Sequence, residues 1–506
     1  MEMELNKRKI EFYDCDYHSS VLHEESGELI IPDTSPDMIR IVSARGRAYA
    51  KEKSQIEGTL SVKGVISGCV LYVADGEESV RKLELNMPFN HSFESKEICN
   101  DAKCTVVVKL ISLEGREINS RKIVLRAHVF IEIKCHNHKT MDLTEAVSEN
   151  DTISVEIKNS NIDFCLPVCI KERSFTIIDD IEIPESQPQL DQLLNDDVEL
   201  KCTDKKIIGN KAILKGIANI KYTYLSKDGG MYCCEHNLPY SQIIDIDDVA
   251  EGCDLATKIN VRMCDIDPVH DMNGDMKYLS VNIVADTVLT ISLKYENETI
   301  EDLYSTTHDI NALFEEMTVK NAPININRRV SLNENIETEN TVKNIIDTRI
   351  TIDPAHFNNG ALKNNALIQL IYLSEDNCIY GVERKCVVEC DLSVPRDAEI
   401  ECETEIAGVT ASGIGNKISV YFSVDYDVKI LGENKIRNLK NLNVGIEKDR
   451  SAEEACVIVK HVYREEPIWN LAKKYNTTVD EIAAANCLDF SETVEPGSMI
   501  LIPCGK

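Results

Sequence analysis

The sequence is poor in aromatic residues and has no long apolar run. Aromatic residues make up 6% of the 506 positions, and tryptophan occurs once, at Trp469. No stretch approaches the roughly 18 apolar residues that a membrane-spanning helix needs, and residues 1–7 include acidic side chains instead of an apolar leader core. We therefore expect no transmembrane segment and no signal peptide, so that the protein stays in the compartment where it is made.

Positive charge is also scarce. The chain has 55 Lys and Arg residues against 86 Asp and Glu residues, a formal net charge of −31. Such a surface repels nucleic acid, anionic wall polymers and bare lipid headgroups. Hydrophobic residues still make up 43% of the sequence. The chain is therefore expected to fold, and its length allows three or four domains of about 100–150 residues.

Catalytic and metal-binding motifs are missing. The sequence has no His-Glu-x-x-His, no Gly-x-Ser-x-Gly and no Cys/His pair with a third partner, so we expect no enzyme, no catalytic residue and no cofactor. Residues 413–417 are glycine-rich but lack the Walker spacing, which favours a hairpin turn. Residues 135–138 and 165–169 have no second ligand pair, and the acidic stretch 265–275 lacks the order of an EF-hand, so we expect no metal site.

The 19 cysteines are scattered along a long chain without a leader. This distribution favours reduced thiols over a disulfide framework. Cys69 and Cys104, for example, lie within apolar stretches, where a cysteine behaves as a small buried hydrophobe.

The chain contains a repeat of about 150 residues. IPDTSP at residues 31–36 returns as IPESQP at 183–188, and LSVKGV at 60–65 matches AILKGI at 212–217, both at an offset of 152. NMPF at 86–89 matches NLPY at 237–240. A third, more diverged copy has ALKN at 361–364 and YLSED at 372–376, which corresponds to YLSKD at 224–228, but it lacks the proline element.

Each copy has the alternation of apolar and polar residues that is typical of β-strands, as at residues 122–133 and 417–428. Glycine-containing turns separate these runs. The fold class predicted is mainly β, with three tandem antiparallel sandwich or barrel-like domains at 1–147, 148–305 and 306–446. Only residues 189–194 and 310–317 are expected to form short helices in this part of the chain.

Residues 455–506 have a different pattern, which predicts a small βααβ domain. Residues 457–462 and 499–503 read as strands, and Pro467 suits the first position of a helix. In that helix Ile468, Leu471, Ala472 and Tyr475 share one face and should be buried. Trp469 is turned about 100° away from that face, at the edge of the surface.

The second helix of this domain should begin at Thr478, because Thr478 and Glu481 have the spacing of a capping box. Its inner face would carry Val479, Ile482, Ala483 and Asn486. An inward amide must be hydrogen-bonded, and we expect Asn486 to bond to the backbone of the following loop.

This C-terminal pattern, with Ile-Trp-x-Leu-Ala, the Asn of helix two, Pro-Gly and a final Leu-Ile-Pro, is similar to LysM, a family best known for binding N-acetylglucosamine polymers. Tandem domains with the Ile-Pro-x-Ser/Thr-x-Pro element and a Lys-Gly strand, followed by LysM, resemble the SPOCS-domain coat proteins of anaerobic endospore formers. The resemblance implies a scaffold in spore coat assembly, located in the mother-cell cytoplasm at the outer forespore surface and spore coat. It also implies binding through LysM to the SpoIVA-like ATPase of the coat's basement layer, and contacts with other coat proteins or with itself.

Two binding functions remain open for the LysM-like domain. The loop that reads Gly-Asp-Thr-Leu-Trp in the LysM family is Glu-Glu-Pro-Ile-Trp at residues 465–469, which removes a small residue and a donor from the sugar groove. A protein partner is therefore favoured over a peptidoglycan or N-acetylglucosamine adaptor function. We expect the partner to contact an apolar anchor with charged neighbours: Trp469, Ile458, Ile468, Glu466 and Lys473. The alternative for Trp469 is that it packs on its own strand as core.

Overall fold

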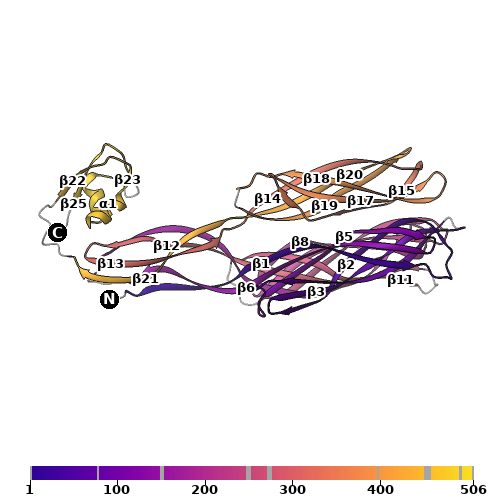
Figure 1. Ribbon diagram of the computed structural model, residues 1–506, viewed down its shortest axis with the longest axis horizontal. Helices are drawn as coiled ribbons and strands as arrows, with labels where there is room; N and C mark the ends of the chain where they lie inside the picture. Colours follow the sequence, from indigo (N-terminus) through magenta and orange to yellow (C-terminus); the bar gives the residue numbers. More distant parts are fainter. Residues whose placement is uncertain are drawn as a thin grey trace.

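The structure is a computed structural model that describes residues 3–76, 79–148, 153–246, 252–270, 276–395, 398–448, 457–488 and 493–503. Antiparallel strands dominate it, and its two short helices lie near the C-terminus. Three groups of strands form a thick body, a thinner stalk extends from it, and a small C-terminal module lies beside the end of the stalk (Figure 1). No helix within the described ranges is long and apolar enough to cross a membrane.

The first strand group is a sandwich of two three-stranded sheets. Its sheets have the orders β1-β6-β5 and β2-β3-β4. The strands are β1 (Leu5–Ile30), β2 (Met38–Ile56), β3 (Thr59–Ala74), β4 (Val80–Glu94), β5 (Lys103–Asn119) and β6 (Lys122–Val147). In β6 every second residue from Ile123 to Cys135 is buried. The alternation seen in the sequence therefore marks the face that packs against the other sheet.

The second strand group repeats this arrangement. Its sheets have the orders β7-β12-β11 and β8-β9-β10. The strands are β7 (Val155–Glu182), β8 (Leu190–Ile208), β9 (Lys211–Ser226), β10 (Met231–Asp245), β11 (Asp254–His270) and β12 (Met276–Ser305). The order of pairing matches that of β1 to β6, as the sequence repeat predicted.

The third strand group follows the same order with two interrupted strands. Strands β13 and β14 together take the place of β1, and β20 and β21 together take the place of β6. The other sheet of this lobe has β15, β17 and β18, and the short strand β16 also pairs with β17. The bounds are β13 (His308–Lys320), β14 (Ile324–Glu337), β15 (Val342–Ile352), β16 (His356–Asn358), β17 (Ala361–Ser374), β18 (Ile379–Asp391), β19 (Glu399–Ile414), β20 (Lys417–Leu431) and β21 (Glu433–Glu447). Residues 415 and 416 form the turn between β19 and β20, so the hairpin prediction for this glycine-rich stretch is confirmed.

The prediction of two short helices in this part of the chain is wrong. Residues 190–194 lie in β8, where shifts of register after Leu190 and Leu193 bring Leu190, Leu193 and Leu194 to buried positions. These bulges reproduce the i, i+3, i+4 spacing of a helix within a strand. Residues 310–317 lie in β13, which pairs with β21 and has its own register shift at Leu313. In both places pairing between strands overrides a local pattern.

The stalk consists of three two-stranded ribbons, one from each strand group. The outer halves of β1 and β6, the outer halves of β7 and β12, and the pair β13–β21 extend beyond the sandwiches. Apolar side chains from all three ribbons pack together inside it: Ile10, Met141, Leu143, Phe164, Tyr295, Ile300, Leu303, Val319, Ile436, Leu439 and Leu442. The stalk therefore depends on all three strand groups.

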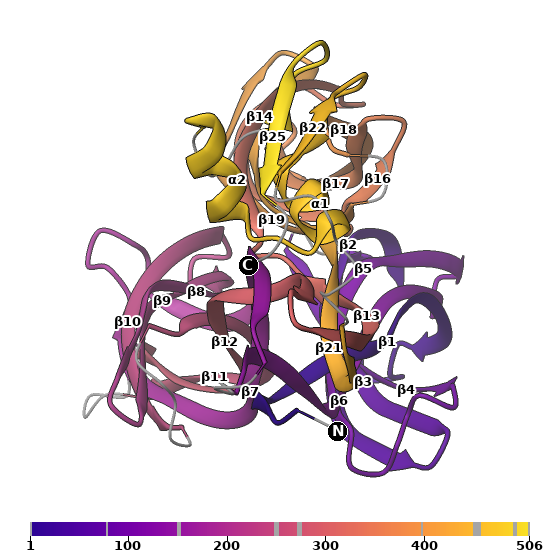
Figure 2. The ribbon, with the colours of Figure 1, turned by 90° about the vertical axis from the view of Figure 1, so that its left-hand side faces the viewer.

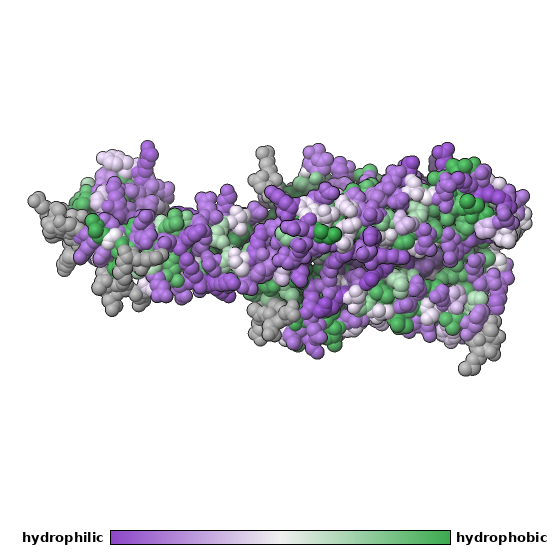
Figure 3. All heavy atoms as spheres, turned by 60° about the horizontal axis from the view of Figure 1, so that its bottom comes forward, coloured by the Kyte–Doolittle hydropathy of each residue, from purple (hydrophilic) through white to green (hydrophobic). Residues whose placement is uncertain are grey.

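The three sandwiches also share a centre. Figure 2 shows them as three lobes around a common axis. An apolar cluster on this axis takes residues from each lobe: Val42, Cys69, Leu71, Val73 and Val80 from the first, Leu194 and Met231 from the second, and Ile371 and Ile379 from the third. The face of the molecule drawn in Figure 3, by contrast, is predominantly hydrophilic, with apolar residues in separate areas.

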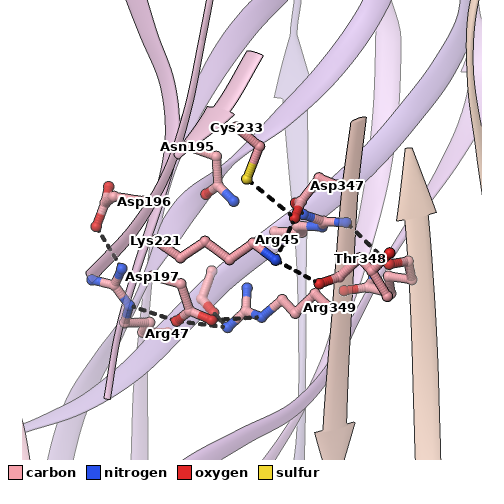
Figure 4. Close-up of polar contacts among 12 residues, drawn as sticks. Arg45, Arg47, Asn195, Asp196, Asp197, Lys221, Cys233, Asp347, Thr348 and Arg349 are labelled. Atoms are coloured by element: carbon pink, nitrogen blue, oxygen red, sulfur yellow. Dashed lines mark hydrogen bonds and ion pairs between the residues drawn. The ribbon is translucent and has the colours of Figure 1, made fainter. Parts of the chain in front are cut away.

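Ion pairs join the lobes next to this cluster (Figure 4). The guanidinium of Arg45 in the first lobe bonds to the carboxylate of Asp347 in the third. The ammonium of Lys221 in the second lobe lies 2.9 Å from the same carboxylate. Burial alone would raise the pKa of Asp347, but the two cations outweigh this effect and hold its pKa well below the usual value. Asp347 is therefore a carboxylate shared by all three lobes.

A second carboxylate lies on the other side of this junction. Arg349 of the third lobe is 3.1 Å from Asp197 of the second, and Arg47 of the first lobe is 3.4 Å from the same residue. Arg47 also bonds to Asp196 at 2.5 Å. The lobes thus meet through an apolar cluster with alternating charges beside it, which fixes their relative orientation.

The C-terminal module (residues 457–503) has the predicted order of strand, helix, helix and strand. Strand β22 (Val457–His461) pairs with β25 (Met499–Pro503), and α1 (Ile468–Tyr475) and α2 (Val479–Asn486) lie between them in sequence. A second, very short pair joins β23 (Glu466–Pro467) to β24 (Thr493–Val494). The fold class, mainly β with a terminal βααβ module, is as the sequence predicted.

Candidate functional site

Helix α1 places the candidate binding residues of the C-terminal module. It begins at Ile468, one residue later than predicted, because Pro467 is its extended N-cap residue. Ile468, Leu471 and Ala472 are buried in the module's core, as predicted from their spacing, and Tyr475 is half-buried. This packing fixes the rotation of the helix and turns Trp469 away from the core face.

Helix α2 holds the module together from the other side. The hydroxyl of Thr478 accepts a hydrogen bond from the Glu481 amide, and the Glu481 carboxylate accepts one from the Thr478 amide, so the predicted capping box is present. The side-chain amide of Asn486 donates to the carbonyl of Leu501 at 2.6 Å and accepts from the Leu501 amide at 2.8 Å. Asn486 thus bonds to strand β25, and the prediction that it bonds to the following loop is wrong.

Trp469 contacts the end of strand β12 in the stalk. Its indole nitrogen donates a hydrogen bond to the carboxylate of Asp302 at 2.9 Å. Its ring meets that of Tyr304 edge to face, with 4.9 Å between centroids and 72° between planes. Aromatic pairs favour this geometry. The half-buried Trp469 therefore packs against another part of the chain as well as against the core cluster that its own module forms with Tyr304.

Three further hydrogen bonds complete this contact, which we call the stalk contact and define by Asp302, Tyr304, Trp469, Lys473 and Thr477. The ammonium of Lys473 donates to both carboxylate oxygens of Asp302, at 2.7 and 2.8 Å. The hydroxyl of Tyr304, which is 4% exposed, donates to the carbonyl of Thr477 at 2.7 Å. The module is thus held on the stalk by charged and aromatic groups together.

The charge of Asp302 is stabilised by this arrangement. Its burial acts to raise its pKa, but the hydrogen bonds from Lys473 and Trp469 and the charge of Lys473 outweigh burial, so its pKa lies below the usual value. Burial also raises the pKa of the Tyr304 phenol, which stays protonated and able to donate. Both groups are therefore in the ionisation states that the contact needs.

The structure does not bring all five predicted binding residues together. Trp469 and Lys473 meet at Asp302. Glu466 lies just before the helix, where its carboxylate pairs with Lys460 of β22 at 2.5 Å. Ile458 is half-buried against the core, and Ile468 is 2% exposed. The partner-binding role of the set stays a prediction, and Ile468 supports it only by positioning α1.

A different face of the module is apolar and exposed. On the outer side of the β22–β25 pair, alternate residues point away from the core, and five large apolar side chains are exposed: Val457, Val459, Tyr463, Met499 and Leu501. Tyr463, with 83% of its surface exposed, also packs against the ring of His461. The sequence reasoning about Trp469 did not identify this face, although the alternation of β22 indicates it.

The other candidate motifs do not form sites in the described part of the chain. Among these residues no three His, Cys, Asp or Glu side chains gather closely enough to hold a metal ion. Asp265 and Asp267 lie on β11, whereas the rest of that acidic stretch, 271–275, is outside the described residues. The described cysteines are free thiols.

Comparison with known protein families agrees with this organisation. The model for the SipL, SPOCS domain matches residues 37–116 and 189–269, which correspond to β2–β5 of the first lobe and β8–β11 of the second. The model for the LysM domain matches residues 462–503. No curated protein and no solved structure matches the chain. The chain therefore combines two SipL-type SPOCS segments with a C-terminal LysM domain, both of them binding-type families, and the SPOCS match indicates a sporulation-related interaction module.

Proposed function

We propose that this protein is a non-enzymatic scaffold of endospore coat assembly that binds a SpoIVA-like coat ATPase through its LysM domain. In this proposal the scaffold localises the ATPase around the forespore, at the mother-cell face. The domains are residues 1–147, 148–305, 306–446 and 455–506. The combination of SPOCS segments with LysM in one chain is the observation that carries the proposal.

The loop before α1 favours a protein partner over a sugar. Glu465 accepts a hydrogen bond from the Thr493 hydroxyl at 2.9 Å, and Glu466 pairs with Lys460. Two carboxylates are thus fixed in the segment where the LysM family carries Gly-Asp-Thr. Together with a net charge of −31, they oppose the approach of anionic wall polymers.

Co-purification tests the proposal. The tagged full chain, expressed with the SpoIVA-like ATPase, is expected to retain it, and a chain lacking residues 455–506 is expected to lose it. Equal retention by both chains would show that the LysM domain is not part of the interface. The second candidate function, binding of peptidoglycan, is tested on chitin and peptidoglycan beads. Specific retention there that is lost in Trp469→Ala would favour a glycan adaptor instead.

A further inference from the structure

The end of β12 is shaped to meet the LysM domain. Ile300 and Leu303 both point into the stalk core, although residues three apart in a regular strand lie on opposite faces. A shift of register between Ile300 and Asp302 accounts for this. The bulge turns Asp302 and Tyr304 outward together, toward Trp469 and Lys473. Bulges commonly re-aim side chains at functional positions.

Asp302 and Tyr304 of β12 meet the polar and aromatic groups of Trp469, Lys473 and Thr477, which together we call the Trp469 edge. The Asp302 carboxylate accepts from both the Trp469 indole and the Lys473 ammonium. The Tyr304 ring covers Trp469, and its hydroxyl bonds to Thr477. Lys448, at the end of the stalk, adds a 2.5 Å hydrogen bond to Asn476 at the end of α1. The edge predicted to bind a partner is therefore already occupied by the chain itself.

We propose that the Trp469 edge recognises a strand that presents a carboxylate and an aromatic ring two residues apart on one face, and that β12 is its internal ligand. This inference rests on the proposed function, because it concerns the same edge of the LysM domain. An external protein partner that uses this edge presents the same chemistry and has to displace Asp302 and Tyr304.

The internal ligand has the advantage of being tethered. Eight residues separate Lys448 from Val457, so the domain stays close to the stalk end after it separates from it. A short tether corresponds to an effective concentration in the millimolar range. The affinity measured for an external partner is then its intrinsic affinity multiplied by the fraction of molecules in which the edge is free.

The first experiment measures the stalk contact without any partner. Trp469 is the single tryptophan, so fluorescence excited at the red edge of the tryptophan band, where the 17 tyrosines absorb little, reports on the surroundings of this one side chain. We expect Asp302→Ala to shift the emission maximum to the red and to raise quenching by acrylamide. Glu298→Ala is the matched control, because Glu298 lies on the same strand, carries the same charge, is exposed and accepts a hydrogen bond from Asn159 at 3.2 Å within the stalk ribbon. It is expected to leave both signals as in the wild type.

A second variant approaches the contact from the other side. Lys473→Ala removes the ammonium while leaving the stalk sequence intact, and it is expected to change the fluorescence in the same direction. The double variant should show less than the sum of the two effects, because both substitutions remove the same ion pair. Unchanged quenching in both single variants would overturn the inference.

The second experiment uses the SpoIVA-like ATPase as the probe. Losing a charge-assisted contact should release the edge, so Asp302→Ala is expected to bind the ATPase about tenfold more tightly than the wild type. If quenching rises but affinity does not, competition is excluded and the inference fails. If quenching rises and neither chain binds the ATPase, the proposed function fails while the internal contact is supported.

Discussion

Arg45 of β2 and Asp347 of β15 form an ion pair across 302 positions of sequence, and only 2% and 3% of their side chains are exposed. The pair lies where the three lobes meet, with Lys221 as a third partner. A buried pair of this kind contributes little net stability compared with apolar residues, but it strongly penalises arrangements that leave one charge alone. Its role is to specify how the lobes fit together.

Removing one member of this pair should be costly. We expect Asp347→Ala to lower the free energy of unfolding by about 3–5 kcal/mol, because the Arg45 guanidinium is left buried without its carboxylate. Denaturant titration with far-UV circular dichroism measures this loss. Asp425→Ala is the control, since Asp425 pairs with an Arg329 that is 64% exposed, and its loss should cost at most about 1 kcal/mol. Equal losses in the two variants would contradict the assigned role.

The contact between the first and third lobes should not tolerate a methyl group at Gly381. A Cβ atom there would lie 1.7 Å from the carbonyl oxygen of Val42 in β2, so the two backbones would have to move apart. We expect Gly381→Ala to destabilise the chain by about 1–3 kcal/mol. At Gly115 an added Cβ would meet its nearest neighbour, Ala44, at 3.4 Å. Thermal unfolding should therefore distinguish Gly381→Ala from a nearly neutral Gly115→Ala.

Acid should weaken a second junction between the lobes, at Glu132. Burial acts to raise its pKa, but a 2.8 Å bond to His18 and the charges of Lys258 and Lys134 lower it to about 2. Because the folded-state pKa is below the unfolded value near 4.5, this carboxylate stabilises the fold above pH 4.5, and the effect is lost as the pH falls through about 2.

The variant Glu132→Gln tests this pH dependence. The difference in unfolding free energy between wild type and variant should be greatest above pH 4.5 and should shrink toward pH 2. Denaturant titrations at several pH values measure it. A difference that stays constant over this range would show that Glu132 does not titrate as described.

The proposed partner interface predicts a specific effect of charge at Trp469. Trp469→Glu should weaken co-purification with the SpoIVA-like ATPase. A carboxylate cannot replace an apolar anchor, and it is repelled by the carboxylate that a partner is proposed to present to this edge. Unfolding of the three β lobes should be unchanged, since Trp469 reaches them through Asp302 and Tyr304 at the end of the stalk and otherwise packs on its own module.

Tyr463→Glu is the matched control for this prediction. It makes the same kind of change on the exposed outer side of β22–β25 and does not touch the stalk contact. Retained binding in Tyr463→Glu would support the Trp469 edge as the interface. If Tyr463→Glu abolished binding and Trp469→Glu did not, the exposed sheet face would be the interface instead.

Much of the fold could be predicted from local sequence pattern. Alternation identified strands such as β6, the 152-residue offset identified two equivalent lobes, and the spacing of Thr478 and Glu481 identified the start of α2. These features depend on residues near one another in sequence, or on the comparison of one segment with another. Bulges in β8 produced a false helical spacing, because a strand with an irregular register no longer alternates.

The relationships between distant segments could not be predicted in this way. Trp469 was correctly placed at the edge of α1, but its partners Asp302 and Tyr304 lie more than 160 residues away and carry no motif. Their outward direction depends on the bulge at Glu301, which the sequence does not indicate. The same is true of Arg45 and Asp347, whose meeting depends on the packing of whole lobes.

Residues at equivalent positions of the three lobes differ in charge, which a single chain of three fused copies makes possible. Arg45 lies opposite Cys69, Asp197 opposite Lys221 and Arg349 opposite Gln369, each at the same place in its lobe. An assembly of identical subunits would put one residue type at all three places, and three like charges would repel one another at the centre. Joining the copies in one polypeptide allows them to diverge. Opposite charges can then pair where the lobes meet, and each lobe has a defined neighbour on either side.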